Sequence, residues 1–132
     1  MDSEFLTYYK EFADSFNRFK DAAAESKEEY EKDLVTQRFQ FTFYAFLNVL
    51  KFLLKKNKVD CDYPSKCIEK AAHFGLLPVE QIYLDMLEDS YEIIKLKNQI
   101  TEKLFQKIKV KYVIALGTFM EKMEKTYFTE KG

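Results

Sequence analysis

One stretch of the chain, residues 37–55 (QRFQFTFYAFLNVLKFLLK), is largely apolar and is interrupted at regular steps by polar residues. Because these steps are of three and four residues rather than two, the pattern predicts a helix and excludes a strand. A helix with so narrow a polar stripe is expected to be covered by protein over most of its circumference. The members of the stripe are Gln37, Gln40, Tyr44, Asn48, Lys51 and Lys55.

Two polar residues, Arg38 and Thr42, lie on the opposite side of this central helix. An unpaired buried charge is costly, so Arg38 is expected to find an anionic partner, a ligand or another subunit. Asp85 or Asp89 is the partner that we expect within the chain. The candidate binding or interface residues on the central helix are Arg38, Gln40 and Tyr44.

The segment before the central helix also has helical spacing. Residues 4–24 carry apolar side chains at steps of three and four, and Ser3 is the expected N-cap. The charged residues 25–33 follow, either as a loop or as a helical lead-in to the central helix, which continues to about Lys56. The expected inward positions of the first helix are Phe5, Tyr8, Phe12, Phe16, Phe19 and Ala23.

Three helices are expected after the central one. A short helix over 64–74 begins at a proline and ends at Gly75, and the next helix begins at Pro78. Residues 93–99 form a joint, and a last helix covers about 100–127. The inward positions of these helices are Ile68, Ala71 and Ala72, then Ile82, Tyr83, Met86 and Leu87, then Leu104, Ile108, Tyr112, Ala115, Phe119 and Met123.

These segments predict an all-α fold, an antiparallel up-and-down four-helix bundle with one additional short helix. The chain of 132 residues is long enough for one domain with a core, and residues 1–132 are treated as that single domain. Only 3 glycines and 2 prolines are present, which disfavours a sheet protein rich in turns. A net charge of −1 gives no overall attraction to nucleic acid.

The sequence predicts a cytoplasmic protein that does not enter a membrane. No run of 18 apolar residues is present, and the acidic N-terminal segment lacks the basic region of a signal peptide. Cys61 and Cys67 are separated by five residues and have no second cysteine pair, and His73 is not at the spacing of a zinc finger. We therefore expect neither a zinc site nor a disulfide framework, and we expect the two thiols to be reduced and inert.

No phosphate-loop, dinucleotide-binding, zinc-protease or esterase motif occurs, and no cofactor is indicated. His73 is expected to be a favourable charge at a helix end rather than a catalytic group.

Two clusters of charged residues are further candidates for a site. The acidic one, Asp85, Glu88, Asp89 and Glu92, could bind Mg²⁺, but a solvated face or a partner for Arg38 is favoured, so no metal site is assigned. The basic one is Lys95, Lys97, Lys103, Lys107, Lys109 and Lys111, for which a solvated face is favoured over phosphate contact.

The central stretch resembles a known family. QRFQFTFYAFLNVLKFLL is similar to the segment QRFEFTFE-x-x-W-K-x-L-K-x-x-L of the nucleotidyltransferase substrate-binding proteins, which are small helical subunits of the HEPN superfamily. HFGLL at 73–77 corresponds to the family's A-G-L-I, and IYLDMLEDS at 82–90 to its W-L-x-M-L-x-D-R. The end of the chain, over 108–123, is similar to its last helix. The resemblance covers roughly residues 30–125.

The resemblance implies a helical bundle that forms a homodimer and pairs with a minimal nucleotidyltransferase chain, which carries the catalytic carboxylates. The helical chain would help to bind the substrate or nucleotide. In related toxin–antitoxin pairs the helical chain is a ribonuclease with an R-x-x-x-x-H-x-Y motif, and the transferase silences it by adenylylation. The match places Ser90, Lys95 and Lys97 at the Arg, His and Tyr of that motif.

These replacements bear on catalysis, because metal-independent RNA cleavage needs a proton-transfer group with a pKa near neutrality. An ordinary lysine stays protonated near neutral pH, so it cannot accept the proton in this reaction. The sequence therefore predicts a non-catalytic binding subunit, in which Lys95, Lys97 and Lys103 are the expected contacts to nucleotide or RNA phosphates. The alternatives are a divergent HEPN ribonuclease toxin, or an interaction module whose ancestral activity has decayed.

Overall fold

Helices form all of the regular structure in the described residues, 2–26, 31–97 and 99–128 of the computed structural model, and no strand occurs within these ranges. The prediction of an all-α fold is therefore confirmed. In chain order the elements are α1 (Ser3–Glu25), α2 (Glu31–Lys56), α3 (Pro64–His73), α4 (Gln81–Leu96), α5 (Glu102–Lys107), the π-helix η1 (Ile108–Tyr112) and α6 (Val113–Tyr127).

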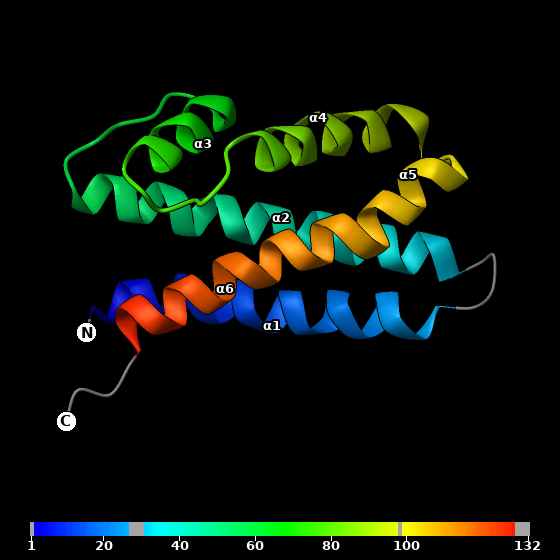
Figure 1. Ribbon diagram of the computed structural model, residues 1–132, viewed down its shortest axis with the longest axis horizontal. Helices are drawn as coiled ribbons and strands as arrows, with labels where there is room; N and C mark the ends of the chain where they lie inside the picture. The colour runs from blue at the N-terminus through cyan, green and yellow to red at the C-terminus, as the bar shows by residue number, and fades with distance from the viewer. Residues whose placement is uncertain (1, 27–30, 98, 129–132) are drawn as a thin grey trace.

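Figure 1 shows how these elements form an up-and-down bundle. α1 and α2 run antiparallel, side by side, and α5, η1 and α6 continue one another as a single long rod that crosses them. α3 and α4 follow one another along α2 and together take the place of one bundle helix. The short extra helix of the prediction is thus α3, which extends the layer that α4 forms.

The phenylalanines of α2 are the centre of the core. Phe39, Phe43 and Phe46 are fully buried, and successive rings stack with centroids 6.0 and 5.8 Å apart. The polar stripe predicted from the sequence is exposed at every position except Gln40, which is partly buried. The exposed members are Gln37, Tyr44, Asn48, Lys51 and Lys55. Two apolar side chains of α2 are also exposed. Phe41, which the pattern placed inside, is 53% exposed, and Leu34, which precedes the predicted stretch, is 43% exposed.

α1 packs along α2 with the predicted face, apart from one position. Tyr9 is buried where the sequence indicated Tyr8, which is only partly buried. The hydroxyl of Tyr9 donates to Oε2 of Glu124 at 3.0 Å, so α1 is tied to α6. The N-cap is Asp2 rather than Ser3, because the Asp2 carboxylate accepts from the main-chain nitrogens of the first turn. Of the charged segment 25–33, residues 27–30 lie outside the described residues.

The boundaries of α3 and α4 differ in part from the prediction. Gly75 has a φ of 78°, a left-handed conformation that glycine adopts without strain, and it ends α3 as expected. α4 begins at Gln81 rather than at Pro78, because the main-chain carbonyl of Glu80 is the first to accept helical hydrogen bonds. α4 then continues through the expected joint to Leu96, and Lys97 ends it in the left-handed conformation.

The last helix contains a π-helical turn that the sequence did not predict. η1 widens the helix at Ile108–Tyr112 and inserts extra backbone between α5 and α6. In this last helix Phe105 and Leu116 are buried, whereas Leu104 and Ala115, which the sequence placed inward, are only partly buried. Ile108, Tyr112, Phe119 and Met123 are buried as expected.

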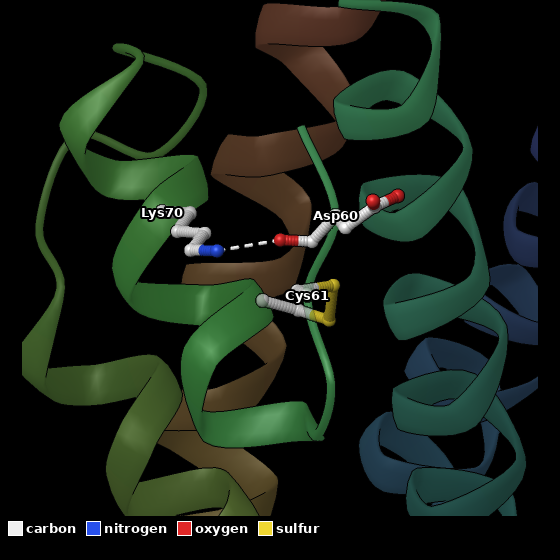
Figure 2. Close-up of a disulfide and its surroundings, with 4 residues drawn as sticks. Asp60, Cys61 and Lys70 are labelled. Carbon is white, nitrogen blue, oxygen red and sulfur yellow. Dashed lines mark hydrogen bonds between the residues drawn. A yellow bond between two sulfur atoms is a disulfide. The ribbon is translucent and has the colours of Figure 1, made fainter. Parts of the chain in front are cut away.

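The expectation of two reduced, inert thiols is wrong for this structure, because Cys61 and Cys67 form a disulfide (Figure 2). The chain turns sharply after α2, where Lys58 adopts a left-handed conformation and the amide of Val59 donates to the carbonyl of Leu54. This turn leads the chain back to the first turns of α3. The two Cα atoms come within 5.2 Å, a separation that a disulfide spans.

Candidate functional site

A hollow of about 600 Å³ lies between α4 and the segment formed by α5 and η1. This volume is in the range of small-molecule sites in proteins. We call it the α4–α5 hollow. On the α4 side it is lined by Asp89, Glu92 and Leu96. On the other side it is lined by Thr101, Lys103, Leu104, Gln106, Lys107, Val110 and Lys111.

Three lysines, Lys103, Lys107 and Lys111, line the hollow at steps of four residues and make one wall positive. Lys103 and Lys111 are exposed, and neither has a carboxylate partner within the described ranges. Of the lysines expected to contact phosphate, Lys103 lies in the hollow, whereas Lys95 and Lys97 are not part of its lining. Lys107 and Lys111 were noted in the sequence only as members of the basic cluster.

Asp89 joins the two walls of the hollow. Its Oδ2 lies 3.0 Å from Nζ of Lys107 and also accepts a short hydrogen bond from the hydroxyl of Tyr112. Burial, together with the neighbouring Asp89 carboxylate, raises the pKa of Tyr112 above its ordinary value. Tyr112 therefore remains a neutral hydrogen-bond donor to Asp89 at physiological pH.

The position of Tyr112 is fixed by the core. Its ring is fully buried and stacks on the ring of Phe39, with centroids 5.2 Å apart and planes inclined by 21°. Tyr112 closes the π-helical turn, and π-turns inside helices are frequent at functional sites. Reasoning from the sequence placed Tyr112 in the core seam but missed its contact with Asp89, since no spacing rule links two residues on separate helices.

The three positions of the ribonuclease motif do not form a cluster. Ser90 is fully buried, and its hydroxyl donates to the carbonyl of Leu87 in the same helix at 2.8 Å. Lys95 is exposed and lies 3.9 Å from Glu92, and Lys97 is exposed at the end of α4. None of the three positions carries a histidine, the side chain that most often transfers protons near neutral pH.

Arg38 does not pair with either of the carboxylates expected for it. Asp89 is taken by Lys107 and Tyr112, and Asp85 accepts from Nε2 of Gln81 at 2.9 Å. Arg38 is only partly buried, so its guanidinium keeps access to water, and the cost of an unpaired buried charge does not arise.

A second hollow, of about 550 Å³, lies where α2 and α4 meet at the surface. We call this surface the α2–α4 face. Gln40, one of the candidate residues, bridges the two helices there by donating from Nε2 to the carbonyl of Ser90 at 3.4 Å. Tyr44, another candidate, is 45% exposed on the same face, beside the exposed ring of Phe41. The face is lined by Asp33, Leu34, Gln37, Gln40, Phe41, Tyr44 and Ile94.

Two further properties concern metals and membranes. In the part of the chain that the structure describes, no three His, Cys, Asp or Glu side chains gather as they would around a metal ion. Three acidic residues of α4 instead have separate partners: Asp85 contacts Gln81, Asp89 contacts Lys107, and Glu92 lies near Lys95. No described helix combines the length and the apolar character needed to cross a membrane.

Comparison with known proteins links this fold to one family. The family model described as "Nucleotidyltransferase substrate binding protein like" matches residues 7–125. The match includes the central helix α2, both walls of the α4–α5 hollow and most of α1 and α6. A search among curated proteins finds no match.

Proposed function

Because this chain belongs to the nucleotidyltransferase substrate binding protein like family, we propose that it is a non-catalytic subunit that binds a substrate or nucleotide for a minimal nucleotidyltransferase. The family description supplies the binding role, and the transferase would be a separate chain that carries the catalytic carboxylates. The transferase would therefore perform the chemistry, and this chain would hold one reactant in place.

The observation that carries the proposal is the α4–α5 hollow, with Lys103, Lys107 and Lys111 along one wall. Lysine side chains are common ligands of phosphate groups, and a wall with three of them favours a phosphate-bearing ligand. Leu96, Leu104 and Val110 provide apolar surface between the charged groups. Such a combination of apolar lining with a few polar groups is typical of small-molecule sites.

A ribonuclease function is less well supported. Ser90 is buried and its hydroxyl donates to a carbonyl of its own helix, and the other two positions, Lys95 and Lys97, are exposed lysines rather than the histidine and tyrosine of the motif. We therefore propose that the chain does not cleave RNA by itself.

The other alternative is an interaction module whose activity has decayed. Nucleotide binding in the presence of the transferase is expected of a binding subunit and not of such a module.

We propose further that the α2–α4 face is the homodimer interface. Tyr44, Phe41 and Ile94 are each about half-exposed there, and such a group of exposed apolar side chains on a small protein commonly marks an interaction surface. The glutamines Gln37 and Gln40 can both donate and accept hydrogen bonds, so two copies of this face can pair with one another across a two-fold axis. The proposed compartment is the cytoplasm.

The proposal is tested by co-expression with a minimal nucleotidyltransferase, sought in the reading frames next to that of this chain, followed by purification on a tag carried by either subunit. We expect the two chains to co-elute, and we expect calorimetry to detect nucleotide or acceptor binding that is stronger with both chains present. If the two chains do not co-elute with the tag on either subunit, the proposed pairing is refuted.

The site is tested with a matched pair of double variants. Lys103→Gln with Lys111→Gln removes two charges from the hollow, and Lys51→Gln with Lys55→Gln removes two exposed charges from α2. We expect the first variant to weaken ligand binding at least tenfold and the second to leave it within twofold. Equal effects of the two variants would show that general charge, rather than the hollow, governs binding.

A further inference from the structure

The middle lysine of the α4–α5 hollow, Lys107, forms an ion pair with a carboxylate of the chain. Nζ of Lys107 lies 3.0 Å from Oδ2 of Asp89, and the two side chains are 35% and 18% exposed. The flanking lysines, Lys103 and Lys111, have no carboxylate partner in the ranges that the structure describes. A ligand that enters the hollow therefore meets two available ammonium groups and one that is already paired.

Asp89 cannot easily leave the hollow to make room for an anion. Its Oδ2 is also held by the hydroxyl of Tyr112, whose ring is buried and stacked on Phe39. When Lys107 turns toward a ligand, the Asp89 carboxylate stays in the wall. The ligand must then compete with a fixed carboxylate for the central lysine.

Among the residues that the structure describes, no aromatic ring lines the hollow. The apolar members of the lining are Leu96, Leu104 and Val110, and its remaining members are charged or polar. Proteins that hold nucleobases commonly stack them on aromatic side chains, which this hollow does not offer. The lysines, in contrast, follow one another along the wall at steps of four residues, so they can contact several successive phosphates.

We propose that the hollow recognises a chain of phosphates rather than a nucleobase, and that Asp89 sets its affinity by competing with the ligand for Lys107. This inference depends on the proposed function in taking the hollow as the binding site. It goes further by naming the part of the ligand that is recognised and the residue that restrains binding. Asp89 acts here through Lys107 and is not a catalytic residue.

The decisive variant is Asp89→Asn. The asparagine Oδ1 can still accept from Tyr112, so the contact that anchors the wall is kept while the ion pair with Lys107 is removed. The control is Glu88→Gln, which removes the same charge from the preceding residue of α4, an exposed position outside the lining of the hollow. Binding of inorganic tripolyphosphate, ATP and GTP to the full chain is measured by calorimetry in phosphate-free buffer.

We expect the unmodified chain to bind ATP and GTP equally within about twofold, and tripolyphosphate nearly as well. Since a partly exposed ion pair contributes modestly, Asp89→Asn should tighten tripolyphosphate binding by about two- to fivefold relative to Glu88→Gln. In a Lys107→Gln background the same Asp89 substitution should leave tripolyphosphate binding unchanged, because the lysine for which Asp89 competes is gone.

Four results would overturn the inference. Two concern the ligand: a strong preference for one nucleotide over tripolyphosphate, and absence of tripolyphosphate binding in every variant. The other two concern Asp89: an effect of its substitution equal to that of the Glu88 substitution, and an effect that persists without Lys107. If the chain still associated with its transferase and bound an acceptor without phosphates, the proposed function would stand while this inference failed.

Discussion

The phenolic hydroxyl of Tyr83 in α4 donates to the main-chain carbonyl oxygen of Ala115 in α6, 2.7 Å away. The Tyr83 ring is 1% exposed and stacks on the ring of Phe46 in α2, with centroids 5.2 Å apart and planes inclined by 18°. One side chain therefore joins three helices of the bundle. Its hydrogen bond is the polar part of a contact that is otherwise apolar.

The substitution Tyr83→Phe tests how much this hydrogen bond contributes to stability. The phenylalanine ring keeps the packing against Phe46 and removes only the hydroxyl. We expect the free energy of unfolding to fall by about 1 kcal/mol, the usual net contribution of one buried hydrogen bond. Urea unfolding measures it, with the slope of the transition unchanged. The control, Tyr91→Phe, alters a side chain that is 52% exposed and should leave stability unchanged.

Buried tyrosines predict a loss of stability at alkaline pH. Burial raises the pKa of Tyr83 to about 12, and burial also raises the pKa of Tyr9 and of Tyr112, with carboxylates adding to the effect on both. In the unfolded chain a tyrosine ionises near pH 10, so above that pH the unfolded state binds fewer protons than the folded one. Stability should be constant with respect to these groups below about pH 10 and should fall as the pH rises toward 12.

Urea unfolding at a series of pH values, with tyrosinate absorbance followed in parallel, measures this loss. In Tyr83→Phe the decrease between about pH 10 and 12 should be shallower, because one of the contributing groups has been removed. Identical slopes for the variant and the unmodified chain would contradict the assignment of the alkaline loss to Tyr83.

Two buried threonines of α2 should respond in opposite ways to replacement by valine. Thr36 is 1% exposed, and its hydroxyl has no hydrogen-bond partner among the described residues, whereas the Thr42 hydroxyl donates to the carbonyl of Arg38 at 2.8 Å. Thr36→Val removes an unsatisfied polar group and should raise the free energy of unfolding by about 1 kcal/mol. Thr42→Val removes a formed hydrogen bond and should lower it by about 0.5–1 kcal/mol.

Thermal and urea unfolding of the two variants form a matched comparison, since valine and threonine have similar shapes and similar helix propensities. The observation that would count against the argument is a loss of stability in Thr36→Val as large as that in Thr42→Val. Such a result would mean that the Thr36 hydroxyl is satisfied in solution.

The sequence predicted the core of this fold because its signal is local. Apolar residues at helical spacing place Phe39, Phe43 and Phe46 on one buried face whatever the surroundings of α2 are. The π-helical turn was not predictable in this way, since Ile108 and Tyr112 are four residues apart and both are buried in either kind of helix. A single inserted residue alters the backbone without breaking the spacing of the seam.

The candidate site was predictable only in part, for a similar reason. Lys103 belonged to a visible basic cluster, and it does line the α4–α5 hollow. The contacts of Asp89 with Lys107 and Tyr112 join helices that are distant in sequence, so they depend on how α4 and η1 approach each other. Charge patterns on one helix cannot specify which residue of another helix will face them.

The disulfide Cys61–Cys67 closes the turn between α2 and α3 and should stabilise it. A bond across so short a loop removes conformational entropy from the unfolded chain, and for a sequence separation of 6 the chain-entropy estimate is about 2 kcal/mol. The double variant Cys61→Ala, Cys67→Ala should lose this amount in urea unfolding. Adding dithiothreitol to the unmodified chain should cause a similar loss.

The reductant separates loss of the bond from loss of packing, because Cys67 is also a buried side chain. Dithiothreitol should not change the stability of the double alanine variant, and any deficit of that variant relative to the reduced chain measures packing alone.

In a reducing cytoplasm the cysteines of the folded chain would be held as thiols, so the chain would operate there in its less stable form. Titration of thiols in protein purified without reductant provides the direct check. Two free thiols per chain under those conditions would show that the bond does not form, and the expected difference in stability would then be absent.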